Sequence, residues 1–301
     1  MRFSFPVSAE FNLTSTMYSH GWYALAPFSV DKERKGITRI FELSSGKIVT
    51  ATIQKSTLAS GNALTVSTDS KLTPAEQRQV TQHIKTCLRL DEKYDHFYQI
   101  ASTHKEFQWV PQLGAGRLLR TPTVYEDVVK MICTTNCSWA LTEILTENLC
   151  KKLGTKVSET AYTFPSPEAI ADCTESYIRK EIRAGYRAPY LLELSKRIVK
   201  KELEIEHWRT SDLPTDELFK LVRSVKGIGP YAAGNILKLL GRYDYLAIDS
   251  WCRAKFFEKH RKGRKTSDKV IEKYYKPLGE WRGLFFWLDL TKYWYERDVE
   301  L

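Results

Sequence analysis

Two patterns of apolar residues divide the chain near residue 70. Before it, short runs of β-branched and aromatic residues alternate with polar segments; these runs are GWYALAPFSV (21–30), ITRIFEL (37–43), KIVTATIQ (47–54) and ALTVST (63–68). The segments between them have the composition of turns: KERKG (32–36), SSGK (44–47) and ASGN (59–62). The pattern predicts a small antiparallel β-sheet domain over residues 1–70.

Beyond residue 70 the apolar residues follow helical spacing, and capping residues mark several helix starts. Two segments have the form of capping boxes, Thr73-Pro74-Ala75-Glu76 and Thr123-Val124-Tyr125-Glu126. Ser166 and Pro167 open another helix, and Thr215 is expected to cap a further one. The polar run CTTNCSW (133–139) interrupts the helical pattern between residues 124 and 153. The expected fold class is α+β and mostly helical, with the sheet followed by a two-lobed helical body over residues 71–301.

A tight turn, KGIGP (226–230), joins two predicted helices that together span residues 216–240. The apolar positions expected to be buried are Leu218, Leu221, Val222, Val225, Ala232, Ala233, Ile236, Leu237 and Leu240. Gly227 and Gly229 allow unusual backbone angles and close approach by another backbone, and Pro230 suits a helix start. The free N–H groups at that start form a seat for a phosphate. The simpler interpretation is a hairpin that needs its glycines only to turn.

The charge balance favours a polyanionic partner. Lys and Arg total 46 against 36 Asp and Glu, a formal net charge of +10, which points first to nucleic acid. No apolar stretch approaches the ~18 residues that a membrane span needs, and the N-terminal segment lacks the apolar core of a secretory signal. We therefore expect an intracellular protein that does not contact a membrane. The six cysteines show no disulfide or metal-ligand spacing and are expected to be reduced thiols.

Asp249 lies at the predicted start of a helix shortly after the hairpin. Aspartate is a common helix cap, so this position alone has a purely structural explanation. However, LVRSVKGIGPYAAGNILKLLGRYDYLAIDSWCR (221–253) resembles the helix-hairpin-helix DNA glycosylases, whose hairpin is followed by an essential Asp. In that family the Asp follows, at a similar spacing, a hairpin position that holds Lys in bifunctional members. Here that position is Tyr231, 18 residues before Asp249.

Three other features support the resemblance, which is strongest over residues 115–255. The run CTTNCSW (133–139) is similar to the polar loop that fills the gap left by a flipped base. RAGYRAPYL (183–191) is similar to the GYRA segment of eukaryotic 8-oxoguanine glycosylases. An N-terminal sheet ahead of the helices is shared with that group and with bacterial alkylpurine glycosylases.

The resemblance implies roles for particular residues. Asp249 would stabilise the positive charge that develops on the sugar when the glycosidic bond breaks. Asn136 would face the estranged base, with Thr135 beside it. The alternative interpretation of CTTNCSW is a simple polar kink in the helix. The hairpin would bind DNA through Lys226, Gly227, Gly229 and Tyr231, and a monovalent cation through the main-chain oxygens of Arg223, Val225 and Ile228. Aromatic residues would line the base pocket, with Trp281 the first choice and Trp139, Trp251, Phe285, Phe286 and Trp287 the other candidates.

Two departures from the family pattern refine these expectations. With Tyr231 in place of lysine, no amine for a Schiff base is evident, so we expect a monofunctional glycosylase. Lys226 lies before the glycines and Lys238 about two turns into the helix, and neither takes the family position. Only Cys252 follows the hairpin, so no iron–sulfur cluster is expected. The expected activity is excision of a damaged base, most favourably a modified purine, from double-stranded DNA in base-excision repair. The enzyme is expected to be a monomer.

Two alternatives stay open at this point: a non-catalytic helix-hairpin-helix DNA-binding protein, and a bifunctional glycosylase/lyase. The lesion also stays open. The GYRA and CTTN segments favour oxidised purines, whereas Tyr231 and Trp281 favour alkylated ones.

Overall fold

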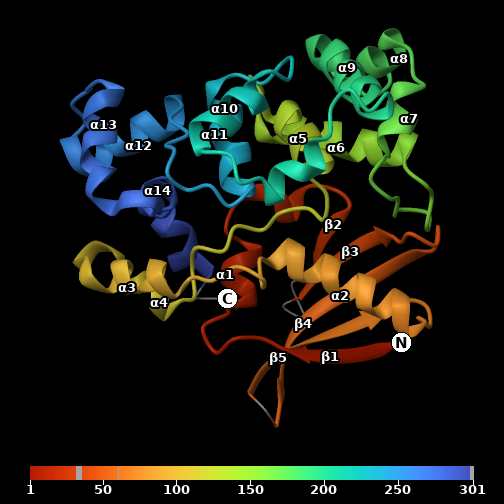
Figure 1. Ribbon diagram of the computed structural model, residues 1–301, viewed down its shortest axis with the longest axis horizontal. Helices are drawn as coiled ribbons and strands as arrows, with labels where there is room; N and C mark the ends of the chain where they lie inside the picture. Colours follow the sequence, from red (N-terminus) through yellow and green to blue (C-terminus); the bar gives the residue numbers. More distant parts are fainter. Residues whose placement is uncertain (32–35, 60, 299–301) are drawn as a thin grey trace. The chain divides into compact units, whose positions relative to one another are not determined.

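The apolar runs near the N-terminus form an antiparallel sheet in the computed structural model, which describes residues 1–31, 36–59 and 61–298 (Figure 1). The strands pair in the order β1-β5-β4-β3-β2. Their bounds are β1 Arg2–Pro6, β2 Phe28–Asp31, β3 Gly36–Glu42, β4 Ile48–Leu58 and β5 Gly61–Thr68. The predicted sheet is confirmed. Residues 32–35 of the turn expected at 32–36, and Ser60 of the turn expected at 59–62, lie outside the described residues.

Two details of the sheet differ from the expectation. Strand β1 was not predicted, because its five residues lie at the sheet edge and pair only with β5. The run that begins at Gly21 predicts a strand, but residues Gly21–Ala24 form a 3-10 helix. Trp22 accounts for this difference, since its buried indole donates a hydrogen bond to Asp127 at 2.9 Å.

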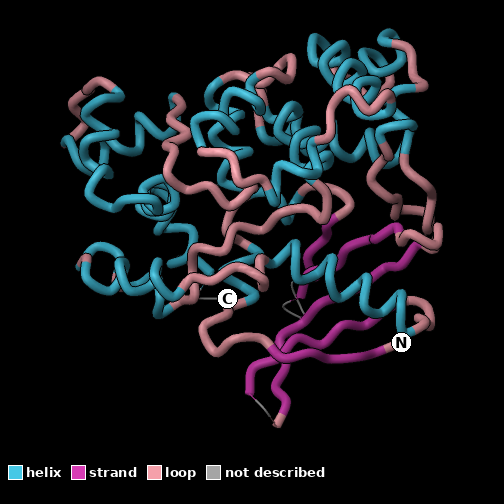
Figure 2. Tube along the Cα trace, in the orientation of Figure 1, coloured by secondary structure: helices cyan, strands magenta, loops and turns pink. Residues whose placement is uncertain are grey.

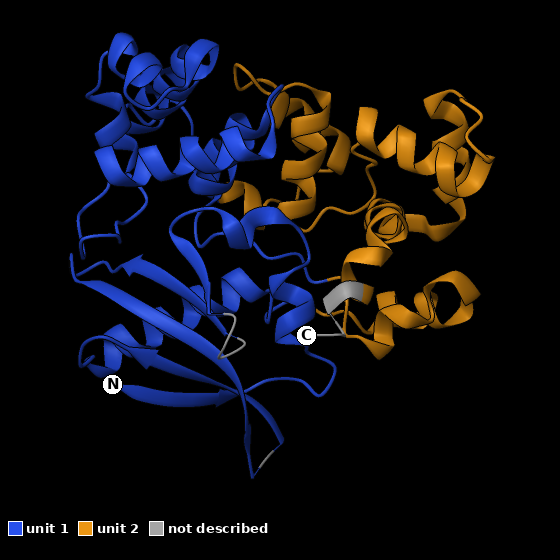
Figure 3. Cartoon of the chain, turned by 180° about the vertical axis from the view of Figure 1, so that it is seen from behind, with its two compact units in different colours: residues 1–92, 117–206 blue, residues 93–116, 207–301 orange. Residues whose placement is uncertain are grey.

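The rest of the described chain is mostly helical (Figure 2). The chain as a whole, sheet included, divides into two compact units (Figure 3). Unit 1 comprises residues 1–92 and 117–206, and unit 2 comprises residues 93–116 and 207–301. The boundary predicted between residues 70 and 71 falls inside unit 1 and stays a prediction. Within the described ranges, none of the helices combines the length and apolar character of a membrane-spanning segment.

Unit 1 joins the sheet to two groups of helices. Helices α1 (Leu13–Met17) and α2 (Pro74–Leu88) both contact the sheet at β3. The His83 ring of α2 stacks on Phe41 of β3, with 5.5 Å between the ring centroids. Thr73 and Glu76 form the predicted capping box at the start of α2. The remaining helices are α5 Val124–Thr134, α6 Trp139–Leu153, α7 Pro167–Ala171, α8 Glu175–Lys180 and α9 Ala188–Val199, with a 3-10 turn at Gly185–Arg187. As predicted, CTTNCSW separates two helices, α5 and α6.

A buried ion cluster joins the sheet to α5. Glu126 accepts hydrogen bonds on both carboxylate oxygens from Arg39 of β3 and lies 2.7 Å from the Lys130 ammonium. All three side chains are at most 3% exposed. The capping box predicted at Thr123 is therefore only half formed. The Thr123 hydroxyl accepts from the Glu126 N–H, but the Glu126 side chain turns to the two cations.

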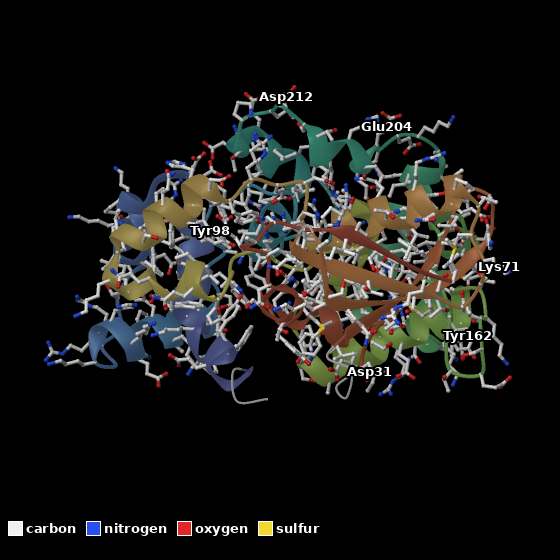
Figure 4. All side chains as sticks on the ribbon, turned by 90° about the horizontal axis from the view of Figure 1, so that it is seen from below. Asp31, Lys71, Tyr98, Tyr162, Glu204 and Asp212 are labelled. Atoms are coloured by element: carbon white, nitrogen blue, oxygen red, sulfur yellow. The ribbon has the colours of Figure 1, made fainter. Side chains whose placement is uncertain are left out.

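Unit 2 contains the predicted hairpin and an aromatic core. Its helices are α3 Asp95–Thr103, α4 Trp109–Gln112, α10 Thr215–Arg223, α11 Pro230–Leu239, α12 Ser250–Arg261, α13 Asp268–Tyr275 and α14 Arg282–Asp298, with 3-10 segments at Lys105–Phe107 and Lys276–Trp281. A further 3-10 helix, Ile205–Thr210, spans the boundary between the units. The Phe285 ring of α14 lies 4.7 Å from Phe97 and from Phe107. Tyr98 of α3, labelled in Figure 4, lies 5.5 Å from Phe97 in the same cluster.

Two local predictions in the hairpin are wrong. Pro214, not Thr215, is the N-cap of α10, and Thr215 is the first helical residue. Leu221 is 36% exposed, because the buried face of this short helix passes through Leu218 and Val222 instead.

Candidate functional site

The turn between α10 and α11 has the backbone geometry expected of a helix-hairpin-helix. Gly227 has a φ of +88°, which favours glycine, and the Val225 carbonyl accepts the Ile228 N–H at 3.1 Å. Gly229 is the N-cap of α11, and Pro230 is the first helical residue. Helix α11 therefore begins at an exposed turn with unpaired N–H groups, and Lys226 is exposed beside it. The monovalent-cation site expected at the main-chain oxygens of Arg223, Val225 and Ile228 stays a prediction.

Gly229 has no structural requirement for the absence of a side chain. Its φ is −80°, which any residue adopts, and a Cβ built on it meets no atom within 4 Å. Every other glycine in the chain either has a positive φ or would bring a Cβ into close contact. The glycine at 229 thus leaves the start of α11 bare without serving the fold.

Asp249 caps α12, as predicted, and accepts the Cys252 N–H at 2.7 Å on one carboxylate oxygen. Its side chain is half-buried. The segment leading to it packs closely on α11 at Gly234. There, a Cβ would lie 2.8 Å from the Tyr245 ring and 2.9 Å from the Ala247 Cβ. The missing side chain at position 234 therefore lets the chain carry Asp249 past the hairpin helix.

The charge of Asp249 acts on four neighbouring side chains, Tyr231, Lys238, Cys252 and Arg253. Burial raises the pKa of Tyr231, and the Asp249 charge raises it further. Burial likewise raises the pKa of the Cys252 thiol to about 12, again with Asp249 adding to the effect. Burial lowers the pKa of Lys238 to about 8, against the charge of Asp249, which favours its protonated form. Tyr231, Lys238, Asp249 and Cys252 thus form one electrostatic group, which we call the Asp249 cluster.

Tryptophans adjoin this cluster. The Lys238 ammonium lies 4.7 Å above the Trp287 ring, and Trp251 lies 6.1 Å from Trp287. Trp294 lies 5.4 Å from Trp287 and 6.1 Å from Trp251. Trp251 and Trp287, both sequence candidates for the base pocket, are half-buried.

The other pocket candidates in unit 2 lie in a different environment. Trp281 stacks on Tyr243 at 5.2 Å, with 20° between the ring planes, and its indole nitrogen lies 3.4 Å from His96. Phe285 is completely buried in the core with Phe97 and Phe107. A role for Phe285 in base recognition would therefore act through the packing of the core.

The residues predicted to face an estranged base lie in unit 1, at the loop after α5. Asn136 is exposed and adopts a left-handed conformation, with a φ of +45°. The carbonyl of Thr135 accepts hydrogen bonds from the Tyr186 hydroxyl at 3.0 Å and from the Arg187 guanidinium. Tyr186 and Arg187 belong to the GYRA segment, so two motifs noted separately in the sequence meet here. No pattern in the sequence indicates that the GYRA segment holds the backbone of the CTTNCSW loop.

Trp139 opens α6 close to this loop. Its ring is 41% exposed and its indole N–H donates to Glu143 at 2.8 Å. A Cβ on Gly21 would lie 2.3 Å from this ring, so the indole rests directly on the Gly21 backbone. Trp139 is thus a surface residue of unit 1, whereas the other five predicted pocket residues belong to unit 2.

Among the described residues, no three His, Cys, Asp or Glu side chains are grouped as metal ligands. The cysteines are all free thiols. Lys238 is the main residue of the Asp249 cluster that the sequence did not assign. The available signal was its spacing of seven residues from Tyr231, two helical turns, which places both on one face of α11.

Comparisons with known proteins give matches to base-excision DNA repair proteins. Residues 129–275 match the family model described as HhH-GPD superfamily base excision DNA repair protein. The chain is 28% identical over 229 residues to a probable N-glycosylase/DNA lyase of Methanothermobacter thermautotrophicus, covering 68% of this chain and 72% of that protein. It is 26% identical over 172 residues to the N-glycosylase/DNA lyase of Saccharomyces cerevisiae, covering 52% of this chain and only 45% of the yeast protein.

Solved structures share the fold over nearly the whole chain. The 3-methyladenine DNA-glycosylase of Archaeoglobus fulgidus has a TM-score of 0.75 at 20% identity, covering 97% of this chain and 99% of that one. An 8-oxoguanine glycosylase/lyase of Clostridium acetobutylicum, bound to double-stranded DNA with cytosine opposite 8-oxoG, has a TM-score of 0.71 at 19% identity. That match covers 97% of this chain and 93% of the other.

Proposed function

The chain belongs to the HhH-GPD superfamily of base-excision DNA repair glycosylases, and from this premise we propose that it flips a modified purine out of duplex DNA and cleaves its N-glycosidic bond at Asp249. The observation that carries the proposal is the juxtaposition of the Asp249 carboxylate with Tyr231 in the first turn of α11. A phosphate bound at the start of α11 would hold the adjoining sugar close to that carboxylate.

The chemistry follows from the charge that develops on the sugar. As the base departs, C1′ and the ring oxygen acquire positive charge in an oxocarbenium-like transition state. An ionised carboxylate fixed beside this charge stabilises it, and one oxygen of Asp249 is already fixed by its bond to the Cys252 N–H. The second oxygen is the one that would face the sugar or an attacking water. In this proposal Trp251 and Trp287 would stack on the extruded base.

The loop at Thr135 and Asn136 would act on the same duplex from unit 1. Extruding a base leaves a gap in the stack and an unpaired partner, at a cost of a few kcal/mol. Asn136 is exposed on a backbone held by Tyr186 and Arg187, so little side-chain or loop ordering would be needed on binding. This supports the gap-filling role over that of a simple polar kink.

The experiment that tests the proposed function is base release by the purified chain from duplexes that each carry one defined lesion. We expect release of at least one oxidised or alkylated purine, scored as strand breaks after alkali. Duplex binding without release of any base would favour the non-catalytic DNA-binding alternative instead.

Strand cleavage after base release is the second candidate activity. The two relatives above are named as lyases, so the comparisons favour the bifunctional alternative over the monofunctional activity expected from Tyr231. A lyase needs an amine, and the Asp249 cluster contains one in Lys238. Comparing strand breaks before and after alkali in the lesion panel distinguishes the two activities.

The bare start of α11 gives a prediction about DNA binding. Gly229→Ala should fold normally, because the backbone angles suit alanine and the new methyl meets open space. If a phosphate sits on the adjacent N–H groups, the methyl will obstruct it, and we expect roughly tenfold weaker binding, the loss of about 1.4 kcal/mol. The measurement is duplex affinity over a range of salt concentrations.

The control for this prediction is Ser267→Ala, at the start of α13. Ser267 is the N-cap of that helix with similar backbone angles and makes no side-chain capping bond. Its substitution should leave both the melting temperature and DNA affinity as they are in the wild type. Unchanged affinity in Gly229→Ala would show that no phosphate approaches this turn.

A further inference from the structure

Lys238 is a buried lysine at the candidate site. It lies near the end of α11, is 4% exposed as a residue, and its ammonium is 4.7 Å above the face of Trp287. Burying an ammonium is costly unless neighbouring charges or aromatic faces compensate. Both kinds of compensation are present, since the Asp249 charge acts on Lys238 and the Trp287 ring lies under its ammonium.

The helix geometry directs this amine toward the hairpin. Residues 231 and 238 are two turns apart on one face of α11, and long side chains on a helix lean toward its N-terminus. Gly234, one turn before Lys238, has no side chain to obstruct that path, and it is also where the segment leading to Asp249 packs on the helix. Lys238 and Tyr231 thus share the helix face on which the segment leading to Asp249 packs, and the Asp249 charge acts on both side chains.

The environment also makes the amine reactive. Burial lowers the pKa of Lys238 to about 8, so a substantial fraction is unprotonated at neutral to mildly alkaline pH. An unprotonated amine is the nucleophile that attacks an aldehyde, and desolvation in an apolar site is one of the ways in which proteins activate lysine.

We propose that Lys238 supplies the amine for a strand-cleaving lyase step at this site, in place of the tyrosine at position 231. The inference rests on the proposed function, because it requires an abasic sugar held beside Asp249. It assigns the lyase activity to a residue two helical turns from the hairpin position.

The Nζ atom of Lys238 adds to C1′ of the open-chain abasic sugar, and loss of water gives a protonated imine. A water molecule takes a proton from C2′, the electron pair of that C–H bond forms a C2′–C3′ double bond, and the 3′ phosphate departs with the C3′–O bond electrons. Water then hydrolyses the imine, which regenerates the amine and releases an unsaturated aldehyde on the 5′ side of the break.

The test is borohydride trapping on a duplex that carries a preformed abasic site, so that it does not depend on base release. Borohydride reduces the imine to a stable secondary amine. We expect wild-type protein to form a covalent adduct, and mass spectrometry of its peptides to place the sugar remnant on Lys238. Lys238→Arg keeps the positive charge but cannot form an imine, and its trapping should fall to background. The rate of trapping by wild type should rise with pH through about 8 as the amine loses its proton.

A matched control is Lys255→Met on α12, where Lys255 pairs with Glu258 at 3.0 Å. This variant should be trapped as efficiently as wild type. Absence of a wild-type adduct, or an adduct mapped to another amine such as Lys226, would overturn the assignment. Base release from lesion duplexes is measured in parallel. Release without trapping refutes the role of Lys238 alone, whereas failure to release any base refutes the proposed function itself.

Discussion

Asp249→Asn should release damaged bases on the order of a thousandfold more slowly than wild type. The substitution removes the negative charge that would oppose the developing cation on the sugar, while it changes the shape of the side chain very little. Asparagine also caps helices as well as aspartate does, so the bond to the Cys252 N–H and the start of α12 should persist. The measurement is single-turnover base release, with duplex affinity and melting temperature determined on the same preparation.

Asp249→Ala separates capping from catalysis. Alanine cannot accept the Cys252 N–H, so this variant should lose about 1 kcal/mol of stability in addition to its activity. If Asp249 served only as a helix cap, the asparagine variant would keep nearly full base release and only the alanine variant would be impaired. That outcome would remove Asp249 from the mechanism.

Glu126→Ala should destabilise unit 1 by about 3–5 kcal/mol, because it leaves two buried cations without their anion. Arg39 and Lys130 both contact the Glu126 carboxylate, and neither side chain has access to water. The measurement is the free energy of unfolding in denaturant, followed by a probe in unit 1. The control is Glu159→Ala, which breaks an exposed pair with Lys156 and should change stability by less than about 0.5 kcal/mol.

The same cluster should contribute to acid sensitivity. Burial alone would raise the pKa of Glu126, but the charges of Arg39 and Lys130 outweigh it and hold that pKa below its ordinary value of 4.5. A lowered carboxyl pKa contributes stability that is fully present above the unfolded pKa and is lost as the pH falls through the folded one. The stability difference between wild type and Glu126→Gln should therefore shrink as the solution is acidified below pH 4.5. A difference that stays constant in acid would contradict this assignment.

The features predicted correctly are those that local sequence determines. The caps at Thr73, Ser166 and Asp249 depend on a side chain bonding to a backbone N–H three residues away, and all three form as expected. The helices on both sides of the glycine turn were recognisable for the same reason. The sheet was evident from its alternating runs, except for β1, whose pairing with β5 joins residues more than fifty positions apart.

The features missed depend on contacts between distant segments. The sequence predicts that Glu126 forms half of a capping box, but its carboxylate instead accepts hydrogen bonds from Arg39, on a strand far earlier in the chain. Phe285 reads as a pocket candidate, yet Phe97 and Phe107 bury it. Lys238 lies seven residues from Tyr231, and only the packing of Asp249 and Trp287 on the same helix face reveals its environment.

The discontinuity of unit 2 has a consequence for synthesis on the ribosome. Phe97 and Phe107 emerge early, but their partner Phe285 is added almost 180 residues after Phe107. At ordinary elongation speed this interval lasts roughly ten to forty seconds. During that time the aromatic surface of α3 and its neighbours lacks its final cover, so the nascent chain should be a client for chaperones until the segment that contains Phe285 has been synthesised.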